Sequence, residues 1–135
     1  MLDPWYVTGF ADGEASFTYS RSGRQLALYF AVKLTATDSP LLEQLQAFFG
    51  VGRLYQVKAS AKTATMYRVT RHDELPRITD HFDRYPLQGE KRRGYVIWRE
   101  MVQLKKLFRN AANRDLIDDL AGKLSSINPR NQGWR

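Results

Sequence analysis

The sequence predicts a mixed α+β domain with a four-stranded antiparallel sheet and helices on one face of that sheet. Two observations predict it. Two pairs of strand-like segments are each joined by a turn or a polar loop, and helix-like segments precede, separate and follow them. The expected order is helix, strand, strand, helix, strand, strand, helix (αββαββα), with further helices at the C-terminal end. Because an antiparallel sheet tolerates water on one side, its second face is expected to stay open.

Local signals define the first three elements. A helix is expected to begin at Asp3-Pro4, because an acid at the N-cap and a proline after it suit a helix start, and to run to Asp12. Residues 16–21 and 26–35 are predicted strands around a turn at 22–24. In the second strand, alternate residues are apolar and define the side that faces the helices: Leu28, Phe30, Val32 and Leu34.

The second half repeats this pattern. Ser39-Pro40 starts a second helix, and Gly50 ends it as a C-cap. Residues 51–58 and 65–70 form the second predicted strand pair, joined by a polar loop over 59–64. A third helix from about Asp73, a basic connector at 91–93, a long helix and a short helix over 115–124 follow. The long helix has one apolar face: Ile97, Met101, Leu104 and Phe108.

Length and composition bound the class of protein. A chain of 135 residues is expected to form one domain over residues 1–127, with a flexible tail over 128–135. Without cysteine there is no disulfide framework and no thiolate metal site. The start of the chain lacks the pattern of a signal peptide, and no apolar run reaches the ~18–20 residues that a membrane helix needs. We therefore expect an intracellular protein with no membrane partner and no small-molecule substrate.

Charge gives the first functional hint. The net charge of +7 and the pI of about 9.9 favour polyanionic partners. Many basic proteins bind no nucleic acid, so charge alone leaves this question open.

The end of the first helix carries the most informative segment. Gly9 and Gly13 lie four residues apart, on the same side of a helix, and each costs roughly 1 kcal/mol relative to alanine. One interpretation is that Gly13 is only a C-cap and that Gly9 makes room for a neighbouring strand. The other is that this bare face lets a second helix approach closely. An acidic pair, Asp12 and Glu14, ends the helix in an otherwise basic protein.

Three segments together resemble the LAGLIDADG homing endonucleases. Gly9-Phe10-Ala11-Asp12-Gly13-Glu14-Ala15-Ser16-Phe17 is similar to the family signature, with departures at Ala15 and at Val7-Thr8. Residues 49–55 (FGVGRLY) are similar to the family's entry into its third strand. Residues 86–92 (PLQGEKR) are similar to its PL-x-x-K-K segment. The resemblance implies the homing-endonuclease fold, with a saddle-shaped sheet that binds DNA.

The resemblance also implies catalytic residues. Glu14 matches the carboxylate that binds a divalent metal, Mg²⁺ or Mn²⁺, and the Gly13 carbonyl is a further candidate ligand. Both residues offer oxygen atoms, which are the ligands that these hard cations prefer, and the glutamate is ionised at pH 7. Lys91 matches the lysine of the catalytic pocket. Asp12 is expected to cap or orient the helix ends. Ala36 stands where the family often has a polar residue, which is a departure from the pattern.

One copy of the motif in this chain implies a homodimer. Two motif helices around a two-fold axis would place two glutamates over the minor groove of a long pseudo-palindromic DNA site, as intron homing requires. The expected interface comprises Trp5, Thr8, Gly9, Asp12 and Gly13. Such a protein would be found with its DNA, in a bacterial or archaeal cytoplasm or in an organelle.

The alternation along the strands nominates the DNA-binding residues. Side chains opposite the apolar face are expected to read bases or phosphates, although each one singly is also explained as a solvated strand residue. Two further arginines follow Lys91 and are candidates for phosphate contacts. The nominated residues are Ser16, Thr18, Ser20, Tyr29, Lys33, Thr35, Arg53, Tyr55, Arg68, Arg92 and Arg93.

Other interpretations stay open at this point. The main alternative is a non-cleaving nucleic-acid binder on the same scaffold, such as an RNA maturase that assists intron splicing. A basic domain that mediates protein contacts is a more distant one. His72 and His81 are expected at the surface, and Trp5 and Trp98, considered singly, in the core.

Overall fold

The αββαββα order is confirmed. The computed structural model describes residues 1–23, 25–59, 62–107 and 111–127. The elements are α1 (Pro4–Glu14), β1 (Ala15–Ser22), β2 (Gln25–Thr35), the 3₁₀ turn η1 (Ala36–Asp38), α2 (Ser39–Phe49), β3 (Arg53–Ala59), β4 (Lys62–Val69), α3 (Leu75–Arg84), α4 (Lys91–Leu107) and α5 (Ala111–Ile127). The predicted tail over 128–135, and Phe108 of the predicted apolar face, lie outside the described residues.

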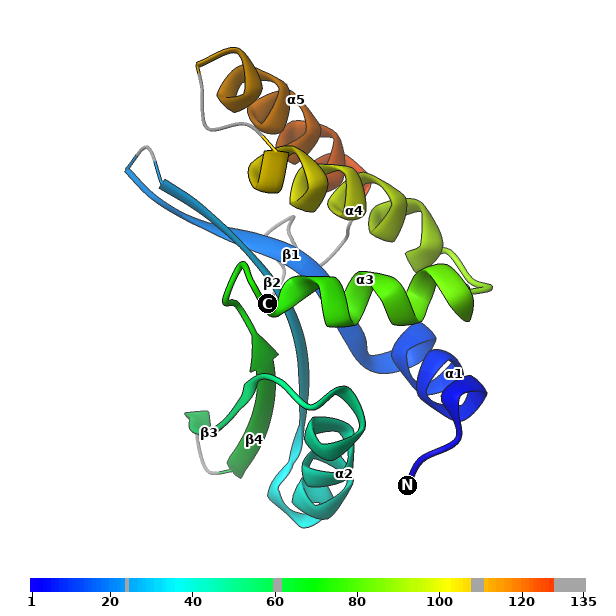
Figure 1. Ribbon diagram of the computed structural model, residues 1–135. Helices are drawn as coiled ribbons and strands as arrows, with labels where there is room; N and C mark the ends of the chain where they lie inside the picture. The colour runs from blue at the N-terminus through cyan, green and yellow to red at the C-terminus, as the bar shows by residue number, and fades with distance from the viewer. Residues whose placement is uncertain (24, 60–61, 108–110, 128–135) are drawn as a thin grey trace.

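The four strands form one antiparallel sheet in the order β1-β2-β4-β3. The eleven-residue β2 joins the two hairpins, because its first half pairs with β1 and its second half with β4 (Figure 1). Ala15 pairs with Val32 at the base of the first hairpin, and Ser22 pairs with Gln25 at its tip. The two hairpins therefore overlap only around the middle of β2.

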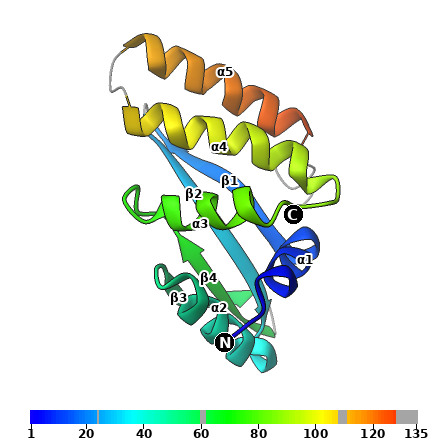
Figure 2. The same ribbon diagram turned by 45° about the vertical axis from the view of Figure 1, so that its right-hand side comes forward.

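The helices cover one face of this sheet, and α3 crosses in front of the strands in Figure 2. Phe17 of β1 and Phe30 of β2 point to this side and pack edge-on or tilted against Phe82 of α3. Trp98 of α4 is fully buried, and its Nε1 donates a hydrogen bond to the Thr18 carbonyl on the edge strand β1 at 2.9 Å. Aromatic rings thus make up much of the interface between the sheet and the helices.

The predicted faces of β2 are confirmed. Leu28, Phe30 and Val32 are buried in the core, and Leu34 packs against it. The opposite side chains of β2 face away from the helices, and among them Lys33 and Thr35 are exposed. The register therefore leaves one face of the sheet uncovered by the chain's own helices, as the alternation predicts.

Three predicted boundaries are wrong. The loop at 59–64 is shorter than predicted, because Ala59 already pairs with Lys62. Ala59 and residues 62–64 lack the apolar alternation of a strand, yet their backbones are paired in the sheet. The basic segment 91–93 is the first turn of α4 rather than a connector. The final helix is α5 over Ala111–Ile127, longer than the predicted 115–124.

Two glycines explain the turn between α2 and β3. Gly50 ends α2 in the left-handed region, with φ 72°, and its N–H donates to the Gln46 carbonyl. Gly52 has φ 91°, and a Cβ atom there would lie 2.6 Å from Cε1 of Tyr67. Both conformation and space therefore require glycine at position 52.

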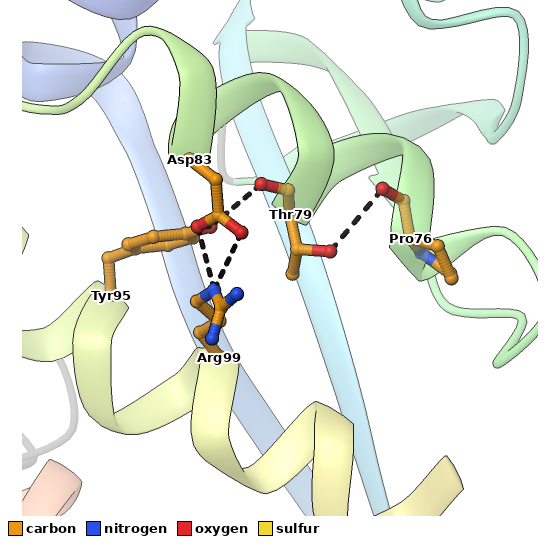
Figure 3. A network of polar contacts seen from close by, with 5 residues as sticks. All are labelled: Pro76, Thr79, Asp83, Tyr95 and Arg99. Atoms are coloured by element: carbon orange, nitrogen blue, oxygen red, sulfur yellow. Dashed lines mark hydrogen bonds and ion pairs between the residues drawn. The ribbon is translucent and has the colours of Figure 1, made fainter.

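A polar network joins α3 to α4 (Figure 3). Nε of Arg99 donates to both carboxylate oxygens of Asp83 at 2.7 Å. The Tyr95 hydroxyl lies 2.9 Å from Asp83 Oδ1 and 3.1 Å from the Thr79 carbonyl. Burial, with the Asp83 carboxylate beside it, raises the pKa of Tyr95 well above its ordinary value. This network fixes α4, whose first turn carries the candidate residue Lys91, relative to the sheet-packed α3.

Candidate functional site

The candidate metal-binding residue, Glu14, is the last residue of α1. Asp3 caps the other end of this helix, where its carboxylate accepts hydrogen bonds from the backbone N–H groups of Trp5 and Tyr6. The chain leaves α1 directly into β1, with Ala15 fully buried. Glu14 is exposed, and within the described part of the chain no hydrogen bond or ion pair engages its carboxylate.

The end of α1 suits a hard cation. The last carbonyls of a helix have no intrahelical partner and carry the negative end of the macrodipole. The last turn of α1 holds no basic side chain to neutralise it. Glu14 adds a carboxylate at the same point, and Gly13 contributes a helix-end carbonyl without side-chain cover. Carboxylate and carbonyl oxygens are ligands that Mg²⁺ accepts, so the donor set fits the metal.

The glycines of α1 are not explained inside the protomer. A Cβ atom built at Gly9 or at Gly13 meets no atom within 4 Å, and neither residue has a positive φ. Gly13 is therefore not a left-handed C-cap, and Gly9 does not make room for a strand. Both are exposed, and so are the neighbouring Trp5 and Tyr6. The expectation that Trp5 lies in the core is wrong, because its side chain is 53% exposed. Its ring makes an edge-to-face contact with that of Tyr85.

Asp12 connects the end of α1 to the start of α4. Its carboxylate accepts hydrogen bonds from the backbone N–H of Gln88 at 2.9 Å and of Gly89 at 3.1 Å. This loop leads into α4 at Lys91, which is half-buried. Asp12 thus orients helix ends, as expected from the sequence, because its two hydrogen bonds connect the end of α1 to the loop before α4. Its place in an interface stays a prediction, since the carboxylate is engaged within the protomer.

The first turn of α4 is strongly positive. Three cationic side chains, those of Lys91, Arg92 and Arg93, occupy a helix N-terminus, where the macrodipole is also positive. Arg93 lies 3.6 Å from Glu90, but both side chains are largely exposed, so that ion pair neutralises little of the charge. The arrangement favours binding of an anion at the start of α4.

Thr8 and His81 are placed differently from expectation. Thr8 is 2% exposed, and its hydroxyl donates to the Tyr85 carbonyl at 2.8 Å and lies 3.0 Å from His81 Nε2. Its predicted place in a dimer interface is wrong, because it faces α3 of its own protomer. His81 is 8% exposed rather than at the surface, and burial lowers its pKa to about 4. Apolar and aromatic neighbours, which the sequence alone did not place together, surround this ring.

The open face of the sheet gathers most of the nominated DNA-binding residues. Thr18 is an exception, because its short side chain lies opposite the larger Tyr29 and is only 5% exposed. Its predicted availability to DNA is wrong in this conformation. Ser16 is half-buried on the same face. The other nominated strand residues keep exposed or half-buried side chains: Ser20, Tyr29, Lys33, Thr35, Arg53, Tyr55 and Arg68.

Charge separates the sheet from the rest of the chain. The four strands carry six lysine and arginine residues and no aspartate or glutamate. Every acidic residue of the chain therefore lies in a helix, a turn or a loop. The net charge of the whole chain does not show this separation, because it averages basic strands with acidic helices and loops. The separation appears only once the strand boundaries are known. The sheet is a surface suited to a polyanion.

The described residues contain neither a membrane-spanning helix nor a cluster of three or more metal-ligating side chains. No helix in the described ranges has the length and apolar character needed to span a membrane. Residues 1–23, 25–59, 62–107 and 111–127 contain no group of three or more acidic or histidine side chains that could bind a metal ion.

The fold and the site define an αββαββα domain with a glutamate at the end of an exposed helix and a basic open sheet. The model of the LAGLIDADG endonuclease family matches residues 7–102 of this chain. That match runs from α1, which carries the glycines and Glu14, into α4. The chain belongs to the LAGLIDADG endonuclease family.

Relatives of known sequence agree. The chain is 35% identical over 114 residues to an uncharacterized 50.9 kDa protein in ND4 intron 1 of Podospora anserina, covering 78% of this chain and 25% of that protein. It is 29% identical to the probable intron-encoded endonuclease 3 of Neurospora crassa, covering 73% of this chain and 19% of that protein. The chain thus spans about a quarter or less of these two relatives.

Solved structures share the fold. The LAGLIDADG meganuclease I-AabMI bound to uncleaved DNA superposes with a TM-score of 0.82 at 28% identity, over 89% of this chain and 44% of that one. I-SmaMI, bound to an uncleaved DNA target in the presence of calcium ions, gives 0.79 at 29% identity, over 95% of this chain and 45% of that one. The homing endonuclease I-TnaI gives 0.81 at 20% identity, over 97% of this chain and 99% of that one, a likeness of fold.

Proposed function

We propose that this chain is a site-specific, metal-dependent DNA endonuclease that cleaves both strands of a long pseudo-palindromic duplex as a homodimer. One observation carries the proposal. The face of α1 that ends at Glu14 is bare: a Cβ atom at Gly9 or Gly13 would meet no atom of the described residues within 4 Å. A second copy of this face can therefore approach it backbone to backbone. Such an approach brings two Glu14 carboxylates close together, which two cuts in a duplex require.

The assembly is supported by lengths and charge. The DNA-bound relatives I-AabMI and I-SmaMI are each covered to less than half by this chain, so two copies match the size of one such protein. A dimer would carry 7 + 7 = +14 charges, from a net charge of +7 per chain. Binding would then be strong and would weaken steeply with salt, as counterions are released from the phosphates. The interface would comprise Trp5, Gly9, Gly13 and the exposed edge of Asp12.

Each residue of the site has a defined task. Glu14 and the Gly13 carbonyl would hold a divalent cation at the negative end of α1, where Mg²⁺ or Mn²⁺ would supply an activated water and would neutralise charge on the departing oxygen. Lys91, at the positive start of α4, stabilises negative charge on the phosphate under attack. Asp12 is a positioning residue, because its two hydrogen bonds to the loop before α4 set the place of Lys91. Arg92 and Arg93 bind neighbouring phosphates.

The open sheet face supplies the remaining DNA contacts. Its register places hydroxyl, aromatic and cationic side chains on one side, away from the helices. An acid-free surface of this width binds the phosphates on either side of a groove and reads base edges between them. The sheet contacts are Ser16, Ser20, Tyr29, Lys33, Thr35, Arg53, Tyr55 and Arg68.

The deciding experiment is plasmid cleavage with and without Mg²⁺, using plasmids that carry sites selected from a random duplex library. Glu14→Gln is expected to abolish cleavage and to leave duplex binding within about threefold. Glu43→Gln is the matched control, because Glu43 is an exposed glutamate of α2 outside the site. Its cleavage rate should equal that of the unmodified chain.

Two results would contradict the proposal. Cleavage that survives Glu14→Gln would remove Glu14 from the chemistry. Tight, salt-dependent binding to structured RNA, with no cleavage of any selected duplex, would favour the maturase function instead. Ala36 is the feature that supports this second function. It is exposed in η1 and stands where the family often has a polar residue.

A further inference from the structure

Arg68 has an uncommon setting on the open sheet face. It lies on β4, an inner strand of the sheet, and its Cζ atom lies 3.9 Å from the centroid of the Tyr29 ring. A guanidinium over an aromatic face is attracted by the ring and loses rotamer freedom. Its Nε is buried and, within the described residues, has no hydrogen-bond partner. The side chain is therefore held in place without an acceptor.

Arg53 lies directly opposite Arg68 on the edge strand β3. Like charges at directly paired positions of an antiparallel sheet repel one another. No acid relieves this repulsion, because the strands carry none and no ion pair to either arginine is found in the described part of the chain. On the other side, Arg68 pairs with Ala31, which is buried and brings no side-chain hydrogen-bond acceptor. The pair is suited to a ligand rich in hydrogen-bond acceptors.

The two arginines differ in ways that assign different tasks. Arg53 is exposed, starts an edge strand and stacks on no aromatic ring of the described residues, which suits a loose phosphate contact. Arg68 is half-buried, central and fixed by Tyr29. A fixed planar fork is the geometry that reads the O6 and N7 acceptors of guanine in a bidentate manner, whereas a phosphate contact needs no such fixation.

We propose that Arg68, held against Tyr29, is a specificity-determining residue that reads one guanine in each half-site, and that Arg53 beside it binds backbone phosphate. The proposal rests on the proposed function, since duplex DNA is the ligand. It goes further than that function because it assigns sequence recognition to Arg68 and sequence-independent affinity to its neighbour Arg53. The same arrangement explains why two arginines are tolerated side by side without an acid.

The test uses duplex binding by the Glu14→Gln chain in Mg²⁺, so that its outcome does not depend on cleavage. Sites are selected from a random duplex library for Arg68→Lys and Arg53→Lys chains in this background. The lysines keep the charge and remove the planar fork. With Arg68→Lys, preference for guanine at one position of each half-site should fall about tenfold or more. With Arg53→Lys, the selected sequence should be unchanged, and Arg53→Gln should lower the salt slope of binding by about two, one for each half-site.

A second measurement changes the base and compares its effect on chains with and without the Arg68 guanidinium. Replacing the guanine at that position with 7-deazaguanine removes the N7 acceptor and keeps the base pair. This duplex should bind the Arg68 chain about tenfold more weakly than the natural duplex, and should bind the Arg68→Lys chain equally well. Tyr29→Phe should preserve the guanine preference, and Tyr29→Leu should weaken it, because only the former keeps the ring.

Several outcomes would overturn the assignment. Arg68→Lys with an unchanged sequence preference would do so, and so would equal, sequence-independent losses for the Arg68 and Arg53 variants, which would make both phosphate contacts only. Loss of cleavage specificity is not used as a readout. A chain that binds guanine-containing sites in this way but never cuts DNA would refute the nuclease proposal and leave the role of Arg68 standing.

Discussion

Thr8 Oγ1 lies 3.0 Å from Nε2 of His81, and this contact joins α1 to α3 within the protomer. The Thr8 hydroxyl has one proton, which it donates to the Tyr85 carbonyl at 2.8 Å. It therefore accepts the other hydrogen bond from Nε2–H. His81 thus carries a proton on Nε2, and its ring packs among those of Phe48, Phe49 and Phe82. One face of α1 is anchored in this way, and its opposite face carries the bare glycines.

The first prediction concerns pH. Burial lowers the pKa of His81 from an ordinary 6.5 to about 4. Between these values the unfolded chain binds a proton that the folded chain does not. Stability from neutral His81 is therefore complete above about pH 6.5 and falls as the pH drops towards 4. The slope should approach, at most, about 1.4 kcal/mol per pH unit.

The measurement is urea unfolding of the chain and of His81→Gln at pH 7.5, 6.0 and 5.0. Glutamine has a side-chain N–H for Thr8 and does not titrate in this range. The difference in the free energy of unfolding between the two chains should shrink as the pH falls. A difference that stays constant across the three pH values would show that His81 is not buried in neutral form.

The second prediction concerns Gly52, which has φ 91° and no space for a Cβ atom. Gly52→Ala should destabilise the fold by about 3 kcal/mol, since the left-handed backbone and the 2.6 Å approach to Tyr67 both oppose it. Thermal unfolding measures the loss. Gly122→Ala is the matched control: it lies in α5 with nothing within 4 Å, so alanine there should stabilise by up to about 1 kcal/mol. Equal stabilities of the two variants would contradict the prediction.

The fold could be predicted further than the site. Alternation along residues 26–35 gave the two faces of β2, and Gly50 gave the end of α2, because period and capping are local signals. The buried position of His81 could not be read in this way. It depends on aromatic rings brought together from α2 and α3. A single histidine forms no repeating pattern along the sequence from which its burial could be predicted.

The site itself was partly predictable. Glu14 and the bare face of α1 follow from short sequence patterns, whereas the hydrogen bonds from Gln88 and Gly89 to Asp12 join residues 76 and 77 positions apart. The stacking of Arg68 on Tyr29 depends on strand register between β2 and β4. Alternation predicts which face a side chain occupies, and it leaves the partner on that face unspecified.

The third prediction concerns the polar network of Asp83, Tyr95 and Arg99 that joins α3 to α4. Removing Asp83 leaves both Arg99 and Tyr95 without their shared acceptor, so Asp83→Ala should cost about 2 kcal/mol of unfolding free energy. Tyr95→Phe should cost about 1 kcal/mol, because Arg99 keeps its bond to Asp83. Asp73→Ala is the control, since its ion pair with Arg71 is largely exposed and should be worth less than about 1 kcal/mol. If Asp73→Ala lowers the free energy of unfolding as much as Asp83→Ala does, the polar network has no special role in stability.

The fourth prediction concerns Asp12 as a positioning residue. Asp12→Ala removes the acceptor of the Gln88 and Gly89 N–H groups and frees the start of α4. If the proposed nuclease function holds, kcat should fall at least tenfold while KM for the duplex changes by less than about threefold, because positioning affects the reacting groups more than binding. Asp12→Asn keeps an amide oxygen as acceptor and should recover part of the rate. Equal losses in the two variants would point to a direct chemical role of the carboxylate.

The last prediction concerns association through α1. Gly9 is exposed, and a Cβ atom there would meet nothing within 4 Å in the described part of the chain, so Gly9→Leu should leave the monomer folded and, by adding a helix-favouring side chain, no less stable. In the proposed dimer the same side chain would separate two helix backbones, and the dissociation constant should rise at least a hundredfold. Sedimentation equilibrium measures it. Gly122→Leu is the matched control, because Gly122 is also exposed in a helix with nothing within 4 Å but lies on α5. If both leucine variants stay as dimeric as the unmodified chain, the two copies do not meet through α1. Loss of the dimer in Gly9→Leu alone would mean that the absence of a side chain at position 9 is selected by a partner, since nothing in its own protomer demands it.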